Sequence, residues 1–391
     1  MQVDAGQSTA APSADFDYFA APEDYRRAAA GHARDGAFHS SRGDGFWVLS
    51  TYAGISAAFR DEAAFSVSRV SAAEGAEDER WVPLTLGGRA HHEWRAHLAP
   101  WFTPQRVRGL TPVFRENARR RIDAFADRGG VSFSDEFARP YALENLMLAV
   151  GWPVADLEHL LAIDVAMIRS REEPDPRAAF NSETAMPALQ DYVARHVARR
   201  RAEPVEGDLT SATFDWEVGG EPVGDADRAS LLAVLFLAGV DSTVNHLANA
   251  VQHLAVTPAD RRRVVAEPEG RPRALEEFLR VNSCMYPGRL VARAGVVGPA
   301  AEGETVLLPL ALANHDPSVF PDPGRVDLGR ERNPHIAFGT GHHQCLGAAL
   351  ARAQILTAWE EWHARIPEYR LADGSGEPRF LRNTYDLRLA W

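Results

Sequence analysis

The sequence contains no lysine, so all 42 of its basic Lys-or-Arg positions are arginine. Schiff-base enzymes, P-loop nucleotide hydrolases and kinases all depend on a lysine, so these classes are excluded. Only two cysteines, Cys284 and Cys345, are present, too few for a disulfide framework or a four-cysteine zinc site. The longest uninterrupted apolar run, from Leu231 to Val240, is about half of what a bilayer crossing requires. We therefore expect no membrane span and a reducing, cytoplasmic location.

The chain of 391 residues is acidic, with 54 Asp and Glu residues and a net charge of −12. This charge disfavours binding to nucleic acid or to an anionic membrane. Hydrophobic residues make up 45% of the chain and charged residues 25%, which is typical of a globular protein. The first residues are polar and lack the basic and apolar segments of a signal peptide. We expect a polar tail over residues 1–17 and a single domain over 18–391.

Hydrophobic spacing of the helical kind predominates along the chain. Helices are expected over five ranges: 103–127, 187–202, 225–256, 273–281 and 346–366. Two short segments, 46–50 and 306–310, have the composition of strands. The sequence therefore predicts a mainly α fold with a small β region.

The middle of the expected helix over 225–256 is apolar on every face, as in a helix that passes through the centre of a large fold. Gly239 interrupts this pattern and costs about 1 kcal/mol relative to alanine inside a helix. Asp241 and Ser242 then place a carboxyl and a hydroxyl group beside the most apolar stretch. Ser242 can bond back to the Ala238 carbonyl and bend the helix. The polar groups can also serve a function, because unpaired buried polar groups cost ~1–3 kcal/mol.

Glycines surround Cys345 in the segment 338–347, FGTGHHQCLG. Glycine permits tight turns and the close approach of a flat ligand, and it leaves backbone N–H groups free to point at a sulfur atom. Strong helix formers follow, so Cys345 is expected at a helix N-terminus, where the dipole lowers the pKa of a thiol. This pattern indicates a ligating thiolate at Cys345, whereas Cys284 is expected to be a core thiol.

The same segment matches F-G-x-G-x-H-x-C-x-G, the haem-ligand signature of the cytochrome P450 family, and the chain resembles this family over nearly its whole length. The resemblance implies the cytochrome P450 fold, a single domain shaped like a triangular prism. It implies haem b as the cofactor, with Cys345 as the axial thiolate on the iron, a ligand that favours oxygen–oxygen cleavage. The resemblance also implies haem contacts at Phe338, Gly339 and Gly347 of this segment, and at Ala238 in the apolar helix over 225–256.

Four residues are implied to hold the haem propionates: His91 and Arg95 in H-x-x-x-R, Arg289, and His343. Their nitrogen donors suit carboxylates, because charge-assisted hydrogen bonds are the stronger kind. A second group is implied to be a structural ion network: Glu277 and Arg280 in E-x-x-R, with Arg325 as its third member.

The segment Ala238–Thr243, A-G-V-D-S-T, resembles the oxygen-binding helix of the family. The resemblance implies Asp241 and Ser242 as the acid–alcohol pair that supplies protons during oxygen activation, and relays of this kind contribute about 10²–10⁴-fold. The usual alcohol of the family is threonine. Serine lacks the methyl group that stiffens χ1, so we expect looser positioning of oxygen and more release of peroxide.

The function implied by the resemblance is a monooxygenase that inserts one oxygen atom from O2 into an apolar small molecule such as a terpenoid or another natural product. Electrons are expected from a separate ferredoxin with its reductase, and the protein is expected to be a monomer. Two alternatives remain: a peroxide-driven haem peroxygenase and a non-catalytic haem-binding sensor. The predicted pocket walls are Trp81, Val82, Phe236 and Tyr286, and the arginines expected to face an acidic partner are Arg106, Arg108, Arg330 and Arg332.

Overall fold

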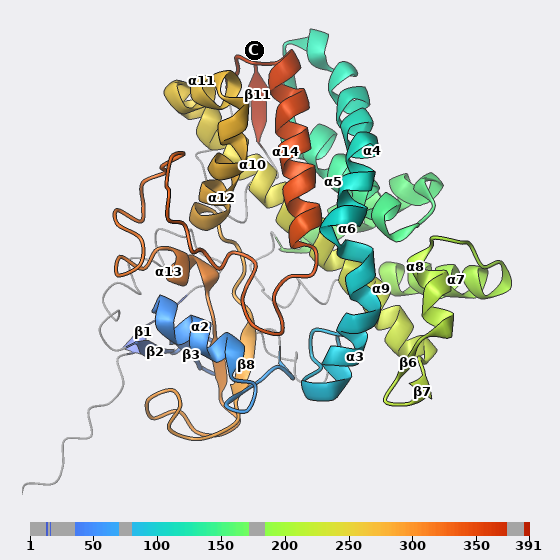
Figure 1. Ribbon diagram of the computed structural model, residues 1–391, viewed down its shortest axis with the longest axis vertical. Coiled ribbons are helices and arrows are strands. Elements are labelled where there is room, and N and C mark those ends of the chain that lie inside the picture. The colour runs from blue at the N-terminus through green and yellow to red at the C-terminus, as the bar shows by residue number, and fades with distance from the viewer. Residues whose placement is uncertain (1–12, 15, 17–35, 70–79, 172–183, 374–386) are drawn as a thin grey trace, which may run out of the picture.

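The computed structural model describes residues 13–14, 16, 36–69, 80–171, 184–373 and 387–391 (Figure 1). Its α-helices are α2 (Tyr52–Arg60), α3 (Gly88–Leu98), α4 (Pro104–Asp123), α5 (Arg139–Val150), α6 (Leu157–Arg171), α7 (Ala185–Ala202), α8 (Leu209–Ala212), α9 (Asp225–Gly239), α10 (Asp241–Val256), α11 (Pro258–Ala266), α12 (Arg271–Val281), α13 (Leu310–Asn314) and α14 (Ala348–Arg365). Its strands are β1 (Ser13–Ala14), β2 (Ala37–Ser40), β3 (Phe46–Leu49), β4 (Phe65–Ser66), β5 (Gly130–Ser132), β6 (Glu217–Val218), β7 (Glu221–Pro222), β8 (Gly288–Val291), β9 (Thr305–Leu307), β10 (Arg370–Leu371) and β11 (Arg388–Ala390).

Within the described residues the strands form three small sheets. The largest has the order β1-β2-β3-β9-β8-β4, in which β9 joins β3 in parallel and β8 in antiparallel orientation. A second sheet, β10-β11-β5, brings the C-terminal strand against β5, and β6 and β7 form a hairpin. Helices account for most of the remaining chain, so the predicted mainly α fold with a small β region is confirmed.

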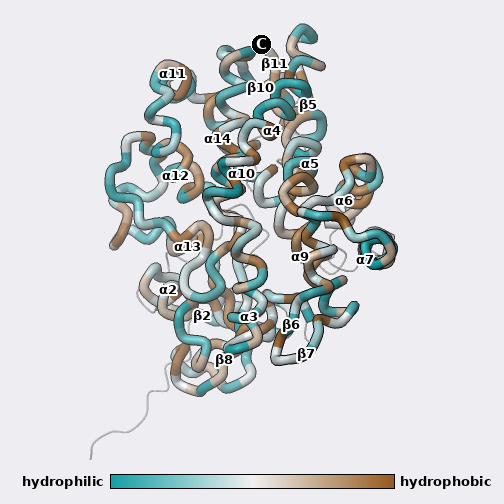
Figure 2. The backbone as a smooth tube through the Cα atoms, turned by 45° about the vertical axis from the view of Figure 1, so that its right-hand side comes forward, coloured by the Kyte–Doolittle hydropathy of each residue, from teal (hydrophilic) through white to brown (hydrophobic). Residues whose placement is uncertain are grey.

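In the part of the chain that the structure describes, the buried hydrophobic side chains form two clusters. The larger lies among the helices and includes Trp94, Trp359 and Trp362, each 1% exposed. The smaller packs against the main sheet and includes Phe38 and Val48, both 0% exposed. Hydrophobic and hydrophilic stretches alternate along most of the outer helices (Figure 2), as expected when one face of each helix is buried.

The long apolar stretch from Asp225 to Val256 passes through the middle of the molecule (Figure 1). It has the length and composition to cross a membrane, but 67% of its most apolar window is buried inside the fold, as in a core helix. The sequence predicts one helix here, and the structure has two, α9 and α10, which meet at Val240. A Cβ atom on Gly239 would lie 2.8 Å from the end of the Leu146 side chain of α5, so a larger residue at this position would require that leucine to move.

The other predicted elements correspond to helices and strands within a few residues. The ranges 103–127 and 346–366 contain α4 and α14, and the segment 46–50 contains β3. The ranges 187–202, 273–281 and 306–310 overlap α7, α12 and β9, each of which begins one or two residues earlier than predicted. The second strand prediction extends too far, because residue 310 already begins α13. Helix α5 was missed because nearly all of its side chains are buried, so no amphipathic period marks it.

The predicted boundary at residue 17 falls in a region where only Ser13, Ala14 and Phe16 are described. Ser13 and Ala14 form β1, which pairs in parallel with β2, and Phe16 is 1% exposed. These three residues therefore belong to the folded body and not to a polar tail. The rest of the predicted tail, and residues 18–35, lie outside the described residues.

Candidate active site

Cys345 lies in the loop that leads into α14. Its backbone N–H donates to the Phe338 carbonyl over 2.8 Å, and the Gly347 N–H donates to the sulfur atom. Gly341 has a φ of +72°, and a Cβ atom there would lie 2.7 Å from the Phe59 carbonyl oxygen, so the turn requires glycine. The loop is thus fixed in one shape with an N–H group directed at the thiol, as the sequence predicts.

The Cys345 side chain has exposed surface although protein surrounds it closely. Burial raises the pKa of this thiol, and the Gly347 N–H together with the charges of Arg95 and Arg352 offsets only part of that rise. The N–H of Gly347, the N-cap residue of α14, lowers this pKa as expected at a helix start, but desolvation is the larger effect and the net shift is upward. A metal ion deprotonates a thiol that coordinates it, so the site suits metal coordination better than free nucleophilic chemistry.

Three buried polar atoms gather beside the cysteine loop. His91 of α3 and His343 stack with ring centroids 3.8 Å apart, and Glu62 Oε1 lies 3.4 Å from His343 Nε2. His91 Nδ1, His343 Nε2 and Glu62 Oε1 are buried without a hydrogen-bond partner among the described residues, and the three ligand atoms lie within 4.8 Å of one another. Burial lowers the pKa of His91 to about 4 and that of His343 to about 3.

Two arginines share this region. The charges of Arg289 and Arg95 both help to lower the pKa of His343. Arg289 is 4% exposed and stacks on the Phe59 ring at 5.4 Å, and no carboxylate pairs with it in the described part of the chain. Burial lowers the pKa of Arg289 to about 10. Arg289 Nη1 donates to the Gly288 carbonyl over 2.7 Å, so the buried positive charge has a hydrogen bond but no paired carboxylate among the described residues. A buried charge without a counter-charge is costly, so these groups fit a ligand that brings carboxylates, as the two propionates of haem do.

Sequence reasoning missed Glu62, which follows α2 and belongs to no motif. Its Oε2 atom accepts a hydrogen bond from the Gly88 N–H over 3.0 Å. Gly88 begins α3, and the N-cap residue of this helix provides no side-chain hydrogen bond. Glu62 therefore caps the helix that carries His91 and Arg95, while its other oxygen faces the two histidines.

At the break between α9 and α10, some residues of this otherwise buried helix have solvent-accessible surface. Ala238 is exposed and Ser242 is partly exposed, although Phe236 and Val240 beside them are 1% exposed. The Ser242 hydroxyl donates to the Ala238 carbonyl over 3.0 Å, which confirms the predicted back-bond at this bend. The bend therefore borders open space.

The Asp241 carboxylate lies beside an arginine of α5, and this arginine also pairs with an aspartate of α6. Neither helix belongs to a sequence motif. Asp241 Oδ1 lies 3.6 Å from Arg139 Nη1 of α5, and the same guanidinium pairs with Asp164 of α6. Arg139 is 1% exposed. No sequence signal could have revealed this contact, because the three residues are far apart in the chain and share no pattern.

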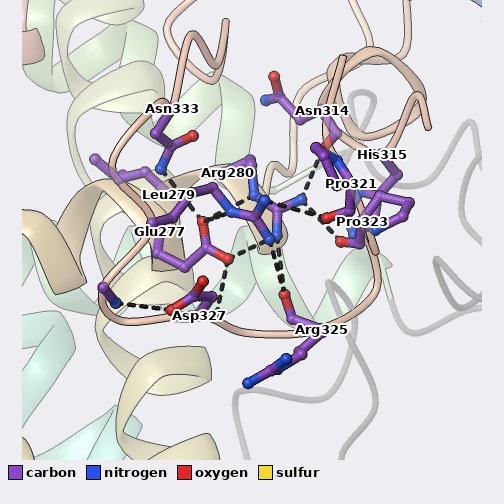
Figure 3. Close-up of polar contacts among 12 residues, drawn as sticks. Glu277, Leu279, Arg280, Asn314, His315, Pro321, Pro323, Arg325, Asp327 and Asn333 are labelled. Carbon is purple, nitrogen blue, oxygen red and sulfur yellow. Dashed lines mark hydrogen bonds and ion pairs between the residues drawn. The ribbon is translucent and has the colours of Figure 1, made fainter. Parts of the chain in front are cut away.

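The E-x-x-R motif forms the buried ion network shown in Figure 3. Glu277 and Arg280 are both 0% exposed and make two hydrogen bonds of 2.7 and 2.9 Å. Arg280 also donates to the carbonyl oxygens of three residues: Asn314, Pro323 and Arg325. The third charged member is Arg330, whose Nε lies 3.0 Å from Glu277, so the assignment of Arg325 was wrong. Arg325 contributes its backbone carbonyl, and its side chain points away from Glu277 (Figure 3).

The predicted pocket residues divide into two pairs. Val82 and Phe236 are 0% and 1% exposed and belong to the larger core cluster, so their side chains pack in the core. This burial speaks against both as pocket walls. Trp81 and Tyr286 are partly exposed and stay a prediction. Cys284 is buried, and burial raises the pKa of its thiol to about 12, as expected for a core cysteine.

Comparison with known proteins bears on this site directly. The family model described as Cytochrome P450 matches residues 300–360, which include the cysteine loop. The probable cytochrome P450 127A1 of Sinorhizobium fredii is 30% identical, over 85% of this chain and 80% of its own length. The chain belongs to the cytochrome P450 family.

Two further relatives of this cytochrome P450 have more specific names. The vitamin D(3) 25-hydroxylase of Pseudonocardia autotrophica is 29% identical, over 86% of this chain and 85% of its own. The solved structure of the bottromycin biosynthetic protein SalCYP has a TM-score of 0.90 and 74% identity, and the match covers 97% of this chain and 95% of that one. The predicted cytochrome P450 fold, the monooxygenase class and the haem b cofactor with its cysteine thiolate are therefore confirmed.

Proposed function

We propose that this cytochrome P450 inserts one oxygen atom from O2 into an apolar intermediate of natural-product biosynthesis, and that its substrate is related to the bottromycin family. The observation that carries the substrate class is the 74% identity with the bottromycin biosynthetic protein SalCYP over 97% of the chain. Electrons come from a separate ferredoxin with its reductase, by analogy with bacterial relatives.

Cys345 would hold the haem iron through its thiolate, and the haem, when bound, would supply the two-electron activation of O2 that no side chain can provide. Arg289 and Arg95 would neutralise the propionates, and His91 and His343 would donate hydrogen bonds to them. The unpaired buried nitrogen atoms of both histidines support this role, because a carboxylate ligand would satisfy them.

Ser242 and Asp241 are the proposed proton-delivery pair. The Ser242 hydroxyl lies at the partly exposed side of the helix break, where it can exchange its bond to Ala238 for one to a ligand. Asp241 keeps a carboxylate beside Arg139 and passes protons inward from there. Both groups therefore hold or move protons at the edge of an otherwise apolar helix.

The proposed docking face for the acidic electron donor includes Arg106 and Arg108. Arg106 stacks on Trp101 at 4.4 Å. Arg108 lines a groove of about 540 Å³ along α4, together with Thr111, Pro112, Arg115, Glu116 and Arg119. The predicted contribution of Arg330 was wrong, because this arginine is engaged with Glu277 and only 10% exposed.

The test uses the purified holoprotein with a bottromycin-type biosynthetic intermediate. The proposal expects a substrate-induced shift of the haem absorption, and an oxygenated product when NADPH, ferredoxin and its reductase are added. Product with hydrogen peroxide alone would favour the peroxygenase, and a shift without product in either reaction would favour the sensor. Cys345→Ser should lose the thiolate-type spectrum of the reduced carbonyl complex, whereas the matched variant Cys284→Ser should keep it.

A further inference from the structure

Beside the Glu277 network, the neighbouring carboxylate Glu276 organises a second cluster that no motif indicates. Arg352 of α14 donates to both Glu276 oxygens, with its Nε at 2.6 Å and its Nη2 at 2.8 Å. His335 Nε2 lies 2.8 Å from the same carboxylate. The Glu276–His335–Arg352 cluster thus joins α12, the segment before the cysteine loop, and α14.

The proton positions in this cluster follow from its hydrogen bonds. His335 Nδ1 accepts from the Ala337 N–H over 3.2 Å, so the ring proton is on Nε2 and is donated to Glu276. Burial disfavours the Glu276 carboxylate, but the hydrogen bonds from Arg352 and His335 outweigh it and hold its pKa at about 2. The carboxylate is therefore ionised and every partner has a defined donor.

The cluster reaches Cys345 through Phe338. The Arg352 guanidinium lies 4.5 Å from the centre of the Phe338 ring, and the Phe338 carbonyl accepts the Cys345 N–H. Arg352 is also seven residues beyond Cys345, and its positive charge acts on the thiol. One side chain thus contacts the residue that holds the cysteine backbone and places a positive charge near the sulfur atom.

We infer that Arg352, oriented by Glu276 and His335, is a positioning residue for the haem ligand: it clamps Phe338, and its charge sets the electron affinity of the haem–thiolate centre. This role rests on the family's cysteine ligand and does not depend on the proposed substrate. A positive charge near the ligand favours the reduced state, and the negative charge of Glu276 opposes it.

The test measures the one-electron reduction potential of the holoprotein. Arg352→Gln removes the positive charge and should lower the equilibrium constant for reduction by up to about tenfold, a shift of about 59 mV to more negative potential. Glu276→Gln keeps the shape of the cluster but removes the negative charge, so the potential should move in the positive direction. Arg352→Lys retains the charge but not the bidentate, stacked geometry, so its reduction potential should stay closer to the original value. Because Phe338 is no longer clamped, more of the reduced carbonyl complex of this variant should lack the thiolate-type spectrum.

Arg365→Gln is the matched control, because Arg365 also lies on α14 and pairs with the carboxylates of Glu361 and Asp123. Its potential should not change. Opposite shifts in Arg352→Gln and Glu276→Gln support the inference, since a merely structural defect would not reverse sign between them. Unchanged potentials in both variants, or shifts of the same sign, would overturn it. If Arg352→Gln does not retain haem, Glu276→Gln and Arg352→Lys still decide the question.

Discussion

Two polar regions flank the cysteine loop, and they differ in whether their buried polar atoms have hydrogen-bond partners. Behind the loop, Glu277 is bonded to two arginines and Glu276 to an arginine and a histidine, so each carboxylate oxygen has a donor. At the proposed propionate cluster, made of His91, Arg95, Arg289 and His343, the buried atoms His91 Nδ1 and His343 Nε2 lack hydrogen-bond partners in the described part of the chain. A folded chain tolerates such atoms where a ligand satisfies them. The first region is built for stability, and the second is built for a ligand.

The largest effect is expected from breaking the paired region. Glu277→Ala leaves Arg280, which is 0% exposed, without its carboxylate, and removal of one partner of a buried ion pair costs about 3–5 kcal/mol. Since domains are stable by only about 5–15 kcal/mol, the variant should be close to unfolding. Denaturant unfolding of the holoprotein measures the loss.

Asp191→Asn provides the comparison, because Asp191 is 61% exposed where it pairs with Arg195 and should contribute no more than about 1 kcal/mol. Equal losses of stability in Glu277→Ala and Asp191→Asn would contradict the assignment of Glu277 as the buried anchor.

The sequence indicated the paired region only in part. Glu277 and Arg280 are three residues apart on one helix, so their contact follows from helix geometry. The third charge could not be assigned in the same way, because Arg325 and Arg330 both lie in an irregular segment whose course decides which side chain turns inward. Spacing predicts contacts within a helix, but it does not predict contacts across a loop.

The propionate cluster was predicted more completely, because each of its four residues stands in or beside a short motif. Glu62 was missed because it belongs to no motif, although one of its oxygens caps α3 and the other faces His343. The same holds for Arg139, which meets Asp241 only after α5 and α10 pack together. That packing depends on tertiary structure and not on local sequence.

The second prediction concerns the region with unpaired donors. His343→Ala removes one donor to a carboxylate ligand, and a hydrogen bond to a charged group contributes about 1.5–3 kcal/mol, which is about 10- to 150-fold in haem affinity. Haem transfer to an acceptor apoprotein measures this loss. His363→Ala is the control for removal of a buried imidazole, because His363 bonds to Trp359 and Tyr369 in the helical core.

The control should lower stability to denaturant without a matching increase in the rate of haem loss. A fast haem loss in His363→Ala but not in His343→Ala would reverse the contrast between the two regions.

The third prediction uses acid to weaken the paired region. The pKa of Glu276 lies at about 2 in the folded protein, below its ordinary value of 4.5. A lowered carboxyl pKa stabilises the fold above pH 4.5, and this contribution is lost as the pH falls from 4.5 toward 2. Because the side chain is 32% exposed, solvent screening reduces the effect to about 1 kcal/mol.

The difference in stability between the original protein and Glu276→Gln, measured by denaturant unfolding at pH 7 and at pH 3, isolates this contribution. The original protein should be the more stable at pH 7, and the difference should shrink at pH 3. A difference that stays constant with pH would mean that the charge of Glu276 does not stabilise the fold.

The smallest effect on stability is expected at the helix break, where the Ser242 hydroxyl is proposed to serve the reaction and not the fold. Ser242→Ala removes a hydrogen bond to a carbonyl at a partly exposed position, so stability should change by no more than about 1 kcal/mol in either direction. Coupling should fall, with less product and more hydrogen peroxide per electron supplied. Thr243→Val is the matched control, because Thr243 is 4% exposed and should leave coupling unchanged. Ser242→Thr should raise coupling, since the added methyl group restricts χ1. Full coupling in Ser242→Ala would remove this hydroxyl from the proton path and leave the bend as its only role.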